Sequence, residues 1–168
     1  DTHIYLMNEI YLYYKKIKII QPNNADYQYK YGGALGMKAK TVNKFKALGM
    51  IDEIKSSFEK AAALDPKHTE SRWALVMLYL ELPGIIGGSE TKATAYSNEL
   101  MRLSPLDGYL SKGYIDEYFG RNKKAELNYC KALELTNSKV AFQKLYNLYL
   151  NRMKNSDKAQ QLKEQFEK

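Results

Sequence analysis

The sequence has few of the residues that mark several classes of protein. It contains one cysteine, Cys130, so neither a disulfide nor a cysteine-based metal site can form within the chain. Its 10 glycines and 4 prolines are too few for a collagen-like or low-complexity chain. No apolar run approaches the ~18 residues of a membrane-spanning helix. At 168 residues and 45% hydrophobic, the chain is long enough to bury the core of one globular domain.

Residues that support catalysis or metal binding are also scarce. The two histidines, His3 and His68, lack a second metal ligand one helical turn away, and we expect His68 to be solvated in a loop. No Gly-x-Ser-x-Gly motif marks a nucleophile. The acidic pairs at 52–53 and 116–117 are adjacent on predicted helices, so their side chains diverge. We therefore predict a buried, inert Cys130, no metal, no cofactor and no enzymatic activity.

Positive charge is in excess but is not clustered. The formal net charge is +7, and lysine supplies 22 of the 26 basic residues. These lysines are spread along the chain, whereas a nucleic-acid interface favours clustered arginine. The charge therefore indicates solvated helix faces and no nucleic-acid partner. Abundant Lys, Asn, Tyr and Ile are typical of an AT-rich bacterial genome.

Residues 106–139 form the clearest repeat unit. They predict two amphipathic helices separated at 120–122, where a glycine permits a left-handed helix end. Small residues at Gly113, Ala125 and Ala132 predict close approach of these helices, with Tyr129 supplying bulk between them. Two further observations indicate the same repeat. An alanine recurs 34 residues after Ala125, which is the length of the unit. The prolines at 22, 66 and 105 each follow a predicted helix and end it.

These positions resemble the tetratricopeptide repeat (TPR) family over nearly the whole chain. The resemblance rests on Gly32, Phe58, Ala61, Pro66, Tyr79, Ala93, Pro105, Tyr109, Gly113, Ala125, Tyr129, Ala132 and Ala159. It implies an all-α fold, a right-handed superhelix of stacked antiparallel helix pairs (a TPR solenoid) with about nine helices. It also implies a scaffold that binds proteins.

The repeat register divides one predicted domain, 1–168, into a lone helix at 1–24 and helix pairs at 25–66, 67–105, 106–139 and 140–168. Three departures from the family pattern are expected to change the local structure. The first pair is long, with extra turns around 40–48, and the second contains an enlarged loop at 82–89. Asn137 stands where the family pattern has a helix-ending proline.

The enlarged loop is the main candidate for a small-ligand site. Residues 78–93 are similar to bacterial TPR-like proteins with an apolar-Pro…Gly-Gly loop, akin to the regulator of microtubule dynamics family, which implies a helical-repeat adaptor. The loop candidates are Gly84, Gly87, Gly88 and Ser89, which would free the backbone and open a helix toward an anion. Under the structural interpretation, Pro83 ends one helix, Ile85 and Ile86 fill the core, and Ser89 caps the next helix.

One face of the first helix in each pair is expected to line the inner wall of the superhelix. The residues on this face are rich in aromatic and methionine side chains, which suit a peptide or helical ligand. The predicted partner groove consists of Tyr29, Lys30, Trp73, Met77, Glu81, Tyr114, Glu117, Tyr118 and Lys144, with Met37, Glu70, Leu110, Leu148 and Arg152 beside them. The alternative is that these residues fill a closed core or lie under a terminal helix. Capture of a chaperone's C-terminal carboxylate is disfavoured, because the Lys and Asn positions of that wall are aromatic, small or apolar here.

The helix predicted at 3–20 is apolar around most of its circumference. We expect such a helix to be buried, either on the first repeat or against another chain, which permits self-association. A membrane surface is a less favoured alternative, because the helix lacks a clean polar face. The chain begins with Asp1 and not Met, and together with the family resemblance this favours an exported bacterial protein over a cytoplasmic one.

Overall fold

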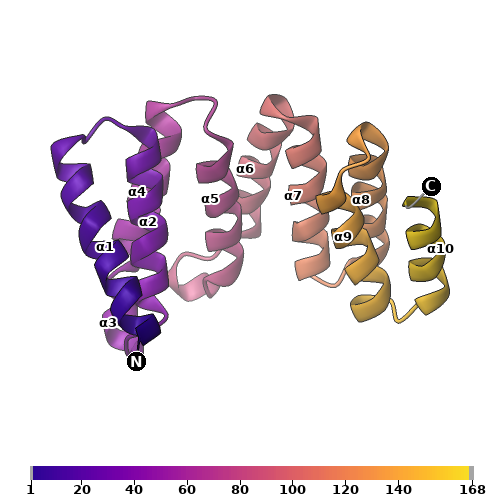
Figure 1. The fold of residues 1–168 in the computed structure, drawn as a ribbon, viewed down its shortest axis with the longest axis horizontal. Coiled ribbons are helices and arrows are strands. Elements are labelled where there is room, and N and C mark those ends of the chain that lie inside the picture. The colour runs from indigo at the N-terminus through magenta and orange to yellow at the C-terminus, as the bar shows by residue number, and fades with distance from the viewer. Residues whose placement is uncertain (1, 167–168) are drawn as a thin grey trace. The chain divides into compact units, whose positions relative to one another are not determined.

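The computed structural model describes residues 2–166, which are helical apart from the connecting turns and loops (Figure 1). The helices are α1 (Thr2–Ile20), α2 (Ala25–Ala39), α3 (Lys44–Leu48), α4 (Ile51–Leu64), α5 (Thr69–Glu81), α6 (Glu90–Leu103), α7 (Pro105–Tyr118), α8 (Asn122–Thr136), α9 (Lys139–Asn147) and α10 (Ser156–Phe166). A 3-10 turn at Gly84–Ile86 and a π-helix at Leu148–Arg152 complete the described secondary structure. The predicted all-α architecture is confirmed, and the short α3 occupies the extra length expected around 40–48.

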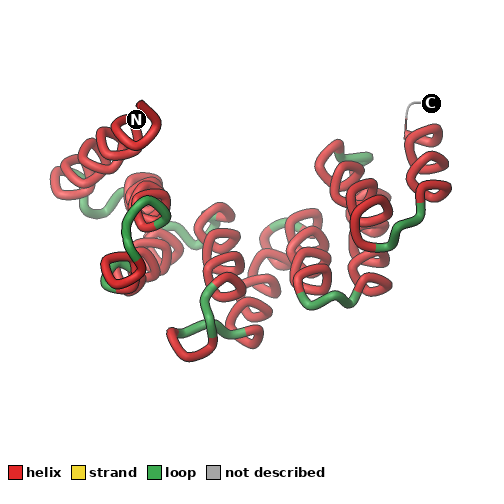
Figure 2. The backbone as a smooth tube through the Cα atoms, turned by 90° about the horizontal axis from the view of Figure 1, so that it is seen from below, coloured by secondary structure: helices red, strands yellow, loops and turns green. Residues whose placement is uncertain are grey.

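The chain divides into two compact units, Asp1–Leu78 and Tyr79–Lys168. In the first unit α2 packs between α1 and α4, and in the second α6, α7, α8 and α9 pack in succession, with α10 against α9. In Figure 2 the described part of the chain consists of helices and loops, without a strand. None of the helices described is both long and apolar enough to span a membrane.

Short polar side chains fix where the helices begin and end. Asn24, Ser89 and Ser138 each accept a hydrogen bond from a backbone N–H in the first turn of α2, α6 and α9, respectively. At the end of α8, Asn137 adopts a left-handed conformation (φ 49°), a role that asparagine fills more readily than most residues. Asn137 thus ends the helix by backbone geometry where the family pattern uses proline.

Each unit contains one glycine that lies directly against an aromatic ring. A Cβ at Gly32 would lie 2.8 Å from Phe58 Cε1, which brings α2 close to α4. In the second unit a Cβ at Gly113 would overlap the fully buried ring of Tyr129, which brings α7 close to α8. The predicted close approach of these helices around Gly113 and Tyr129 is confirmed.

The hydroxyls of three buried tyrosines donate to glutamates on neighbouring helices. The Tyr31 hydroxyl is 2.6 Å from Glu53 Oε1, and Lys18 Nζ lies 3.2 Å from the same oxygen. Burial and the neighbouring carboxylate raise the pKa of Tyr31. The hydrogen bond from Tyr31, assisted by Lys18, lowers the pKa of Glu53 even though burial alone would raise it. This cluster ties α1, α2 and α4 together.

The second unit repeats this arrangement twice. The Tyr149 hydroxyl donates to Glu126 Oε1 at 2.9 Å, and Lys158 Nζ lies 2.6 Å from that oxygen. The Tyr129 hydroxyl donates to Glu117 Oε2 at 2.8 Å, and burial with the Glu117 charge raises the pKa of Tyr129. Neutral phenols are thereby held on ionised carboxylates, a charge-assisted hydrogen bond.

Of the two expected ways to bury the first helix, packing on the first repeat covers only part of it, and burial against another chain stays a prediction. In α1 only Tyr11 is buried among the described residues, against Tyr31 at a centroid distance of 5.9 Å. Large apolar side chains elsewhere on the helix are exposed, including Tyr5, Leu12 and Ile19. The chain supplies α2 as a partner for one side of α1 and leaves the remaining apolar surface uncovered.

Substituting Gly113 by alanine tests the glycine–aromatic contact. We expect Gly113→Ala to lower the free energy of unfolding by about 1–3 kcal/mol, because Tyr129 cannot move away from the added methyl without losing its packing. The matched control is Gly33→Ala in α2, where a Cβ meets no atom within 4 Å; helix propensity should make that variant up to about 1 kcal/mol more stable. Urea titration compares the two, and equal effects would contradict the packing argument.

Acid titration tests the tyrosine–glutamate bonds. Although burial opposes it, hydrogen bonds from Lys158 and Tyr149 lower the pKa of Glu126, so its contribution to stability is present above the ordinary carboxylate pKa and is lost as pH falls through the lowered value. Tyr149→Phe should therefore cost about 1–2 kcal/mol at neutral pH, and the difference from the unsubstituted protein should shrink in acid. Tyr146→Phe is the control, since no hydrogen bond joins its hydroxyl to another described residue. A difference that stays constant with pH would exclude the charge-assisted bond.

Candidate protein-binding surface

In the second unit, the predicted wall residues at the end of α5 and on α7 and α9 are neighbours in space. We call this the α7–α9 surface, and it consists of Glu81, Tyr114, Glu117, Tyr118, Lys144 and Arg152. Lys144 Nζ lies 5.1 Å from the centroid of the Tyr114 ring, within reach of a cation–π interaction. Arg152 Nε lies 3.6 Å from Glu117 Oε1. A cation–π contact thus joins α9 to α7, and an ion pair joins the π-helix to α7.

Exposure on this surface is partial and varied. Tyr114, Glu117 and Lys144 are half-buried, and Tyr118 is 46% exposed. Burial, followed by the charges of Glu81 and Glu117 and by Tyr118, raises the pKa of Tyr114, so this phenol stays neutral. The surface thus presents two aromatic rings with carboxylates and cations at their edges. Leu110 and Leu148, expected on the same wall, are buried and belong to the core.

The sequence pattern does not indicate the π-helix that follows α9. In Leu148–Arg152 the hydrogen bonds widen by one residue, and the N–H of Met153 donates to the carbonyl of Leu148 at 2.9 Å. This wider turn lies where Tyr149 meets Glu126 and Arg152 meets Glu117. The π-helix therefore serves a core contact and a surface contact within one turn.

In the first unit the predicted wall residues take several different roles. Tyr29 packs against Phe58 and His68, at centroid distances of 5.9 and 5.3 Å, so much of its ring contributes to internal packing. Trp73 is half-buried. The others are exposed to different degrees: Lys30, Met37, Glu70 and Met77. Met77 is 41% exposed and is the large apolar side chain of this group most open to a ligand.

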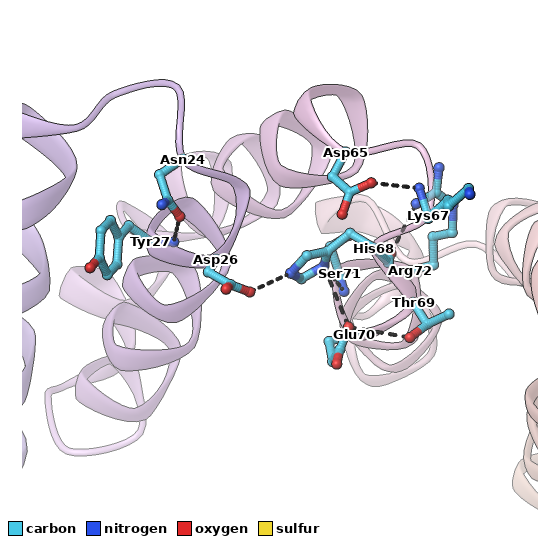
Figure 3. Close-up of polar contacts among 10 residues, drawn as sticks. All are labelled: Asn24, Asp26, Tyr27, Asp65, Lys67, His68, Thr69, Glu70, Ser71 and Arg72. Atoms are coloured by element: carbon cyan, nitrogen blue, oxygen red, sulfur yellow. Dashed lines mark hydrogen bonds and ion pairs between the residues drawn. The ribbon is translucent and has the colours of Figure 1, made fainter.

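His68 is buried, which corrects the expectation of a solvated side chain (Figure 3). Its Nδ1 accepts a hydrogen bond from the backbone N–H of Ser71, so its Nε2 carries the proton that points to Asp26 Oδ1, 3.1 Å away. Arg72 donates to the carbonyls of His68 and Ala62. His68 thus caps α5 and links it to the start of α2, a structural role that a partner 42 residues away conceals from sequence analysis.

The Gly84–Ser89 loop is held by its own backbone. The N–H groups of residues 86–89 donate to carbonyls of Pro83, Gly84, Pro83 and Tyr79 in turn, so these four donors are already used. A side chain at Gly88 would overlap the Leu82 carbonyl, and Gly87 is left-handed at φ 106°. Ser89 caps α6 as predicted. The prediction that Ile85 fills the core is wrong, because Ile85 is 96% exposed and only Ile86 is half-buried.

Two polar clefts were not anticipated. In the first unit a cleft of about 420 Å³ lies between α1, α2 and α4, and Lys18, Glu53 and Lys60 line it. In the second unit a cleft of about 370 Å³ lies between α6, α7 and α8, where Arg121 bonds Asp116 and Glu90 at 2.7 Å each. The carboxylates named in these clefts are already paired, Glu53 with Lys18 and both Asp116 and Glu90 with Arg121, so they link the helices that form the clefts.

A metal centre would need several ligating side chains close together within residues 2–166. No group of three or more His, Cys, Asp or Glu side chains lies close enough there to hold a metal ion. Cys130 is half-buried, and burial followed by the charge of Glu126 raises the pKa of its thiol, which disfavours the reactive thiolate. The α7–α9 surface is therefore the best candidate for a functional site in the second unit.

Comparison with known proteins gives the fold but no close relative. Neither a protein-family model nor a curated protein matches the sequence. A thermophilic TPR protein of Thermus thermophilus matches the structure with a TM-score of 0.63 at 16% identity, covering 98% of this chain and 92% of that one. Two crystal structures of MamA match with TM-scores of 0.58 and 0.56, at 20% and 19% identity, covering 90% and 95% of this chain and 85% and 80% of theirs. With its succession of packed helices and these structural matches, the chain has the TPR fold.

Proposed function

We propose that this protein is a non-enzymatic interaction module that binds a peptide or helical segment of another protein. The observation that carries the proposal is the α7–α9 surface, where Tyr114 and Tyr118 lie among Lys144, Arg152 and two carboxylates. Aromatic rings give broad contact area at little entropy cost, and they are frequent anchors of protein interfaces. Helical-repeat proteins commonly present such extended surfaces to their partners.

The chemistry of the surface favours a partner segment of mixed character. Half-buried Tyr114 and more exposed Tyr118 offer apolar faces for an aliphatic or aromatic anchor. Around them Lys144 and Arg152 can pair with acidic groups, while Glu81 can pair with a basic one. An amphipathic helix meets these requirements, because its apolar stripe is bordered by charged residues. In the first unit Trp73, Met77, Tyr29 and Lys30 are proposed as further contacts.

Peptide selection tests this proposal without knowledge of the natural partner. Peptides enriched from a random display library on the full chain should bind Tyr118→Ala about tenfold more weakly, because an interface aromatic contributes on the order of 1–2 kcal/mol. Tyr114→Ala and Trp73→Ala should weaken binding as well, with largely unchanged thermal melts. Fluorescence anisotropy measures the affinities.

The matched control for these variants is Leu127→Ala, which removes a large exposed side chain from α8, a helix that contributes no residue to the surface. It should leave peptide affinity unchanged. If all variants bind equally well, the α7–α9 surface is not the binding site. If Tyr114→Ala and Trp73→Ala both unfold the protein, these residues belong to the core and the groove proposal fails.

Self-association is a second candidate function, and the exposed apolar surface of α1 supports it. In this alternative the protein is a structural element that assembles from copies of itself. A soluble TPR scaffold rarely leaves so many large apolar side chains of one helix exposed without a partner for them. This candidate and the α7–α9 surface use different residues, so one protein can have both functions.

Small-ligand binding at the Gly84–Ser89 loop is the least supported alternative, because four consecutive N–H groups are already bonded there. We expect inorganic phosphate and nucleotides to produce no shift in the thermal melting temperature. The control is sodium chloride at matched ionic strength, because general screening changes stability without saturating as a binding site would. A saturable shift that Ser89→Ala abolishes would establish the loop as a ligand site.

A further inference from the structure

The uncovered surface of α1 contains a regular seam of five large apolar or aromatic residues and one histidine. His3, Leu6, Ile10, Tyr13, Ile17 and Ile20 follow one another at alternating spacings of three and four residues. This is the spacing of the a and d positions of a coiled coil, with His3, Ile10 and Ile17 at a and Leu6, Tyr13 and Ile20 at d. We call these six residues the α1 seam.

The seam is open in the structure. Leu6 and Tyr13 are each 56% exposed and Ile20 is 72% exposed, while Ile10 and Ile17 are half-buried. The side of α1 that packs on α2 is a different one and includes Tyr11, whose ring meets Tyr31. The α1 seam thus borders the α1–α2 contact and remains available to another helix along its length.

Charged residues beside the seam identify what fits it. Glu9 and Lys16 occupy the same flanking position in successive heptads, and both are exposed. Within the described residues neither forms an ion pair. In an antiparallel coiled coil, such flanking positions of the two helices meet each other, so Glu9 of one copy would lie beside Lys16 of the other. Two-fold symmetry makes this pair twice.

We propose that two copies of this chain associate through the α1 seam, with their α1 helices antiparallel. The same alignment pairs a with d positions throughout: His3 with Ile20, Leu6 with Ile17 and Ile10 with Tyr13 of the second copy. On the other flank it places Met7 beside Tyr14 of the second copy. A parallel alignment would put Glu9 near Tyr14 and Lys16 near Gln21, where no opposite charge stands.

The inference deepens the self-association candidate and rests on it, but it is independent of the α7–α9 surface. It assigns the second copy as the occupant because the seam is complementary to itself in both apolar residues and charge. A heterologous partner helix would not require Glu9 and Lys16 to lie at positions that meet under a two-fold axis. The antiparallel register is therefore the part of the proposal that experiment can test most sharply.

Charge reversal on the full chain tests the register. Sedimentation equilibrium should show a concentration-dependent dimer for the unsubstituted protein. Glu9→Lys and Lys16→Glu should each weaken dimerisation about tenfold, because each places two like-charged pairs across the interface. When these two variants are mixed, every cross pair is again opposite in charge, so a heterodimer should form at least as tightly as the original dimer.

Matched substitutions elsewhere on α1 are the controls. Leu6→Glu should abolish the dimer, whereas Leu12→Glu, a similarly exposed position outside the seam, should leave it intact. Circular dichroism melts check that each variant is folded. A strict monomer at high concentration would overturn both this proposal and the self-association candidate. A dimer that persists in Leu6→Glu would overturn the α1 interface alone, and a dimer without recovery on mixing would overturn the antiparallel register.

Discussion

A phenol that is buried between helices must find an acceptor for its hydroxyl, and much of this structure follows from that requirement. Burying an unpaired hydroxyl costs on the order of 1–3 kcal/mol, so the helix that carries the tyrosine and the helix that carries the acceptor must keep one register. Tyr129 shows the consequence most clearly. Its ring lies against Gly113, its hydroxyl reaches Glu117, and both of these residues belong to α7. One side chain therefore fixes α8 on α7 by shape and by polarity.

The same bond links the core to the candidate binding surface. Glu117 accepts from buried Tyr129 with one oxygen and faces Arg152 with the other, while Lys144 covers the neighbouring Tyr114. The excess of lysine and the excess of tyrosine are related throughout the chain, since lysine ammonium groups lie over the rings of Tyr31, Tyr11, Tyr79 and Tyr149 as well. Part of the positive charge thus covers aromatic surface at the helix edges.

The features that the sequence predicted correctly are those with local signals. Proline, capping residues and small-residue spacing determine helix order, and the α7–α8 contact follows from residues a few turns apart. His68 was mispredicted because its partner, Asp26, is distant in sequence. Ile85 was mispredicted because backbone hydrogen bonds alone hold its loop. For α1, an apolar circumference correctly indicates a need for cover, but periodicity does not reveal whether the chain itself supplies that cover. The neighbours on the α7–α9 surface were predicted by repeat position, and their cation contacts were not.

The π-helix after α9 has a consequence for how this protein can vary. A π turn accommodates one extra residue, so the residues after it lie about a quarter turn or more from where an unbroken α-helix of the same sequence would place them. Leu148–Arg152 is therefore a phase shift between the packing of α9 and the placement of Arg152. The same residues wound as a regular α-helix would turn Arg152 away from Glu117, with little change in helical content. The helical winding at this point, as well as residue identity, therefore sets the charge pattern of the surface.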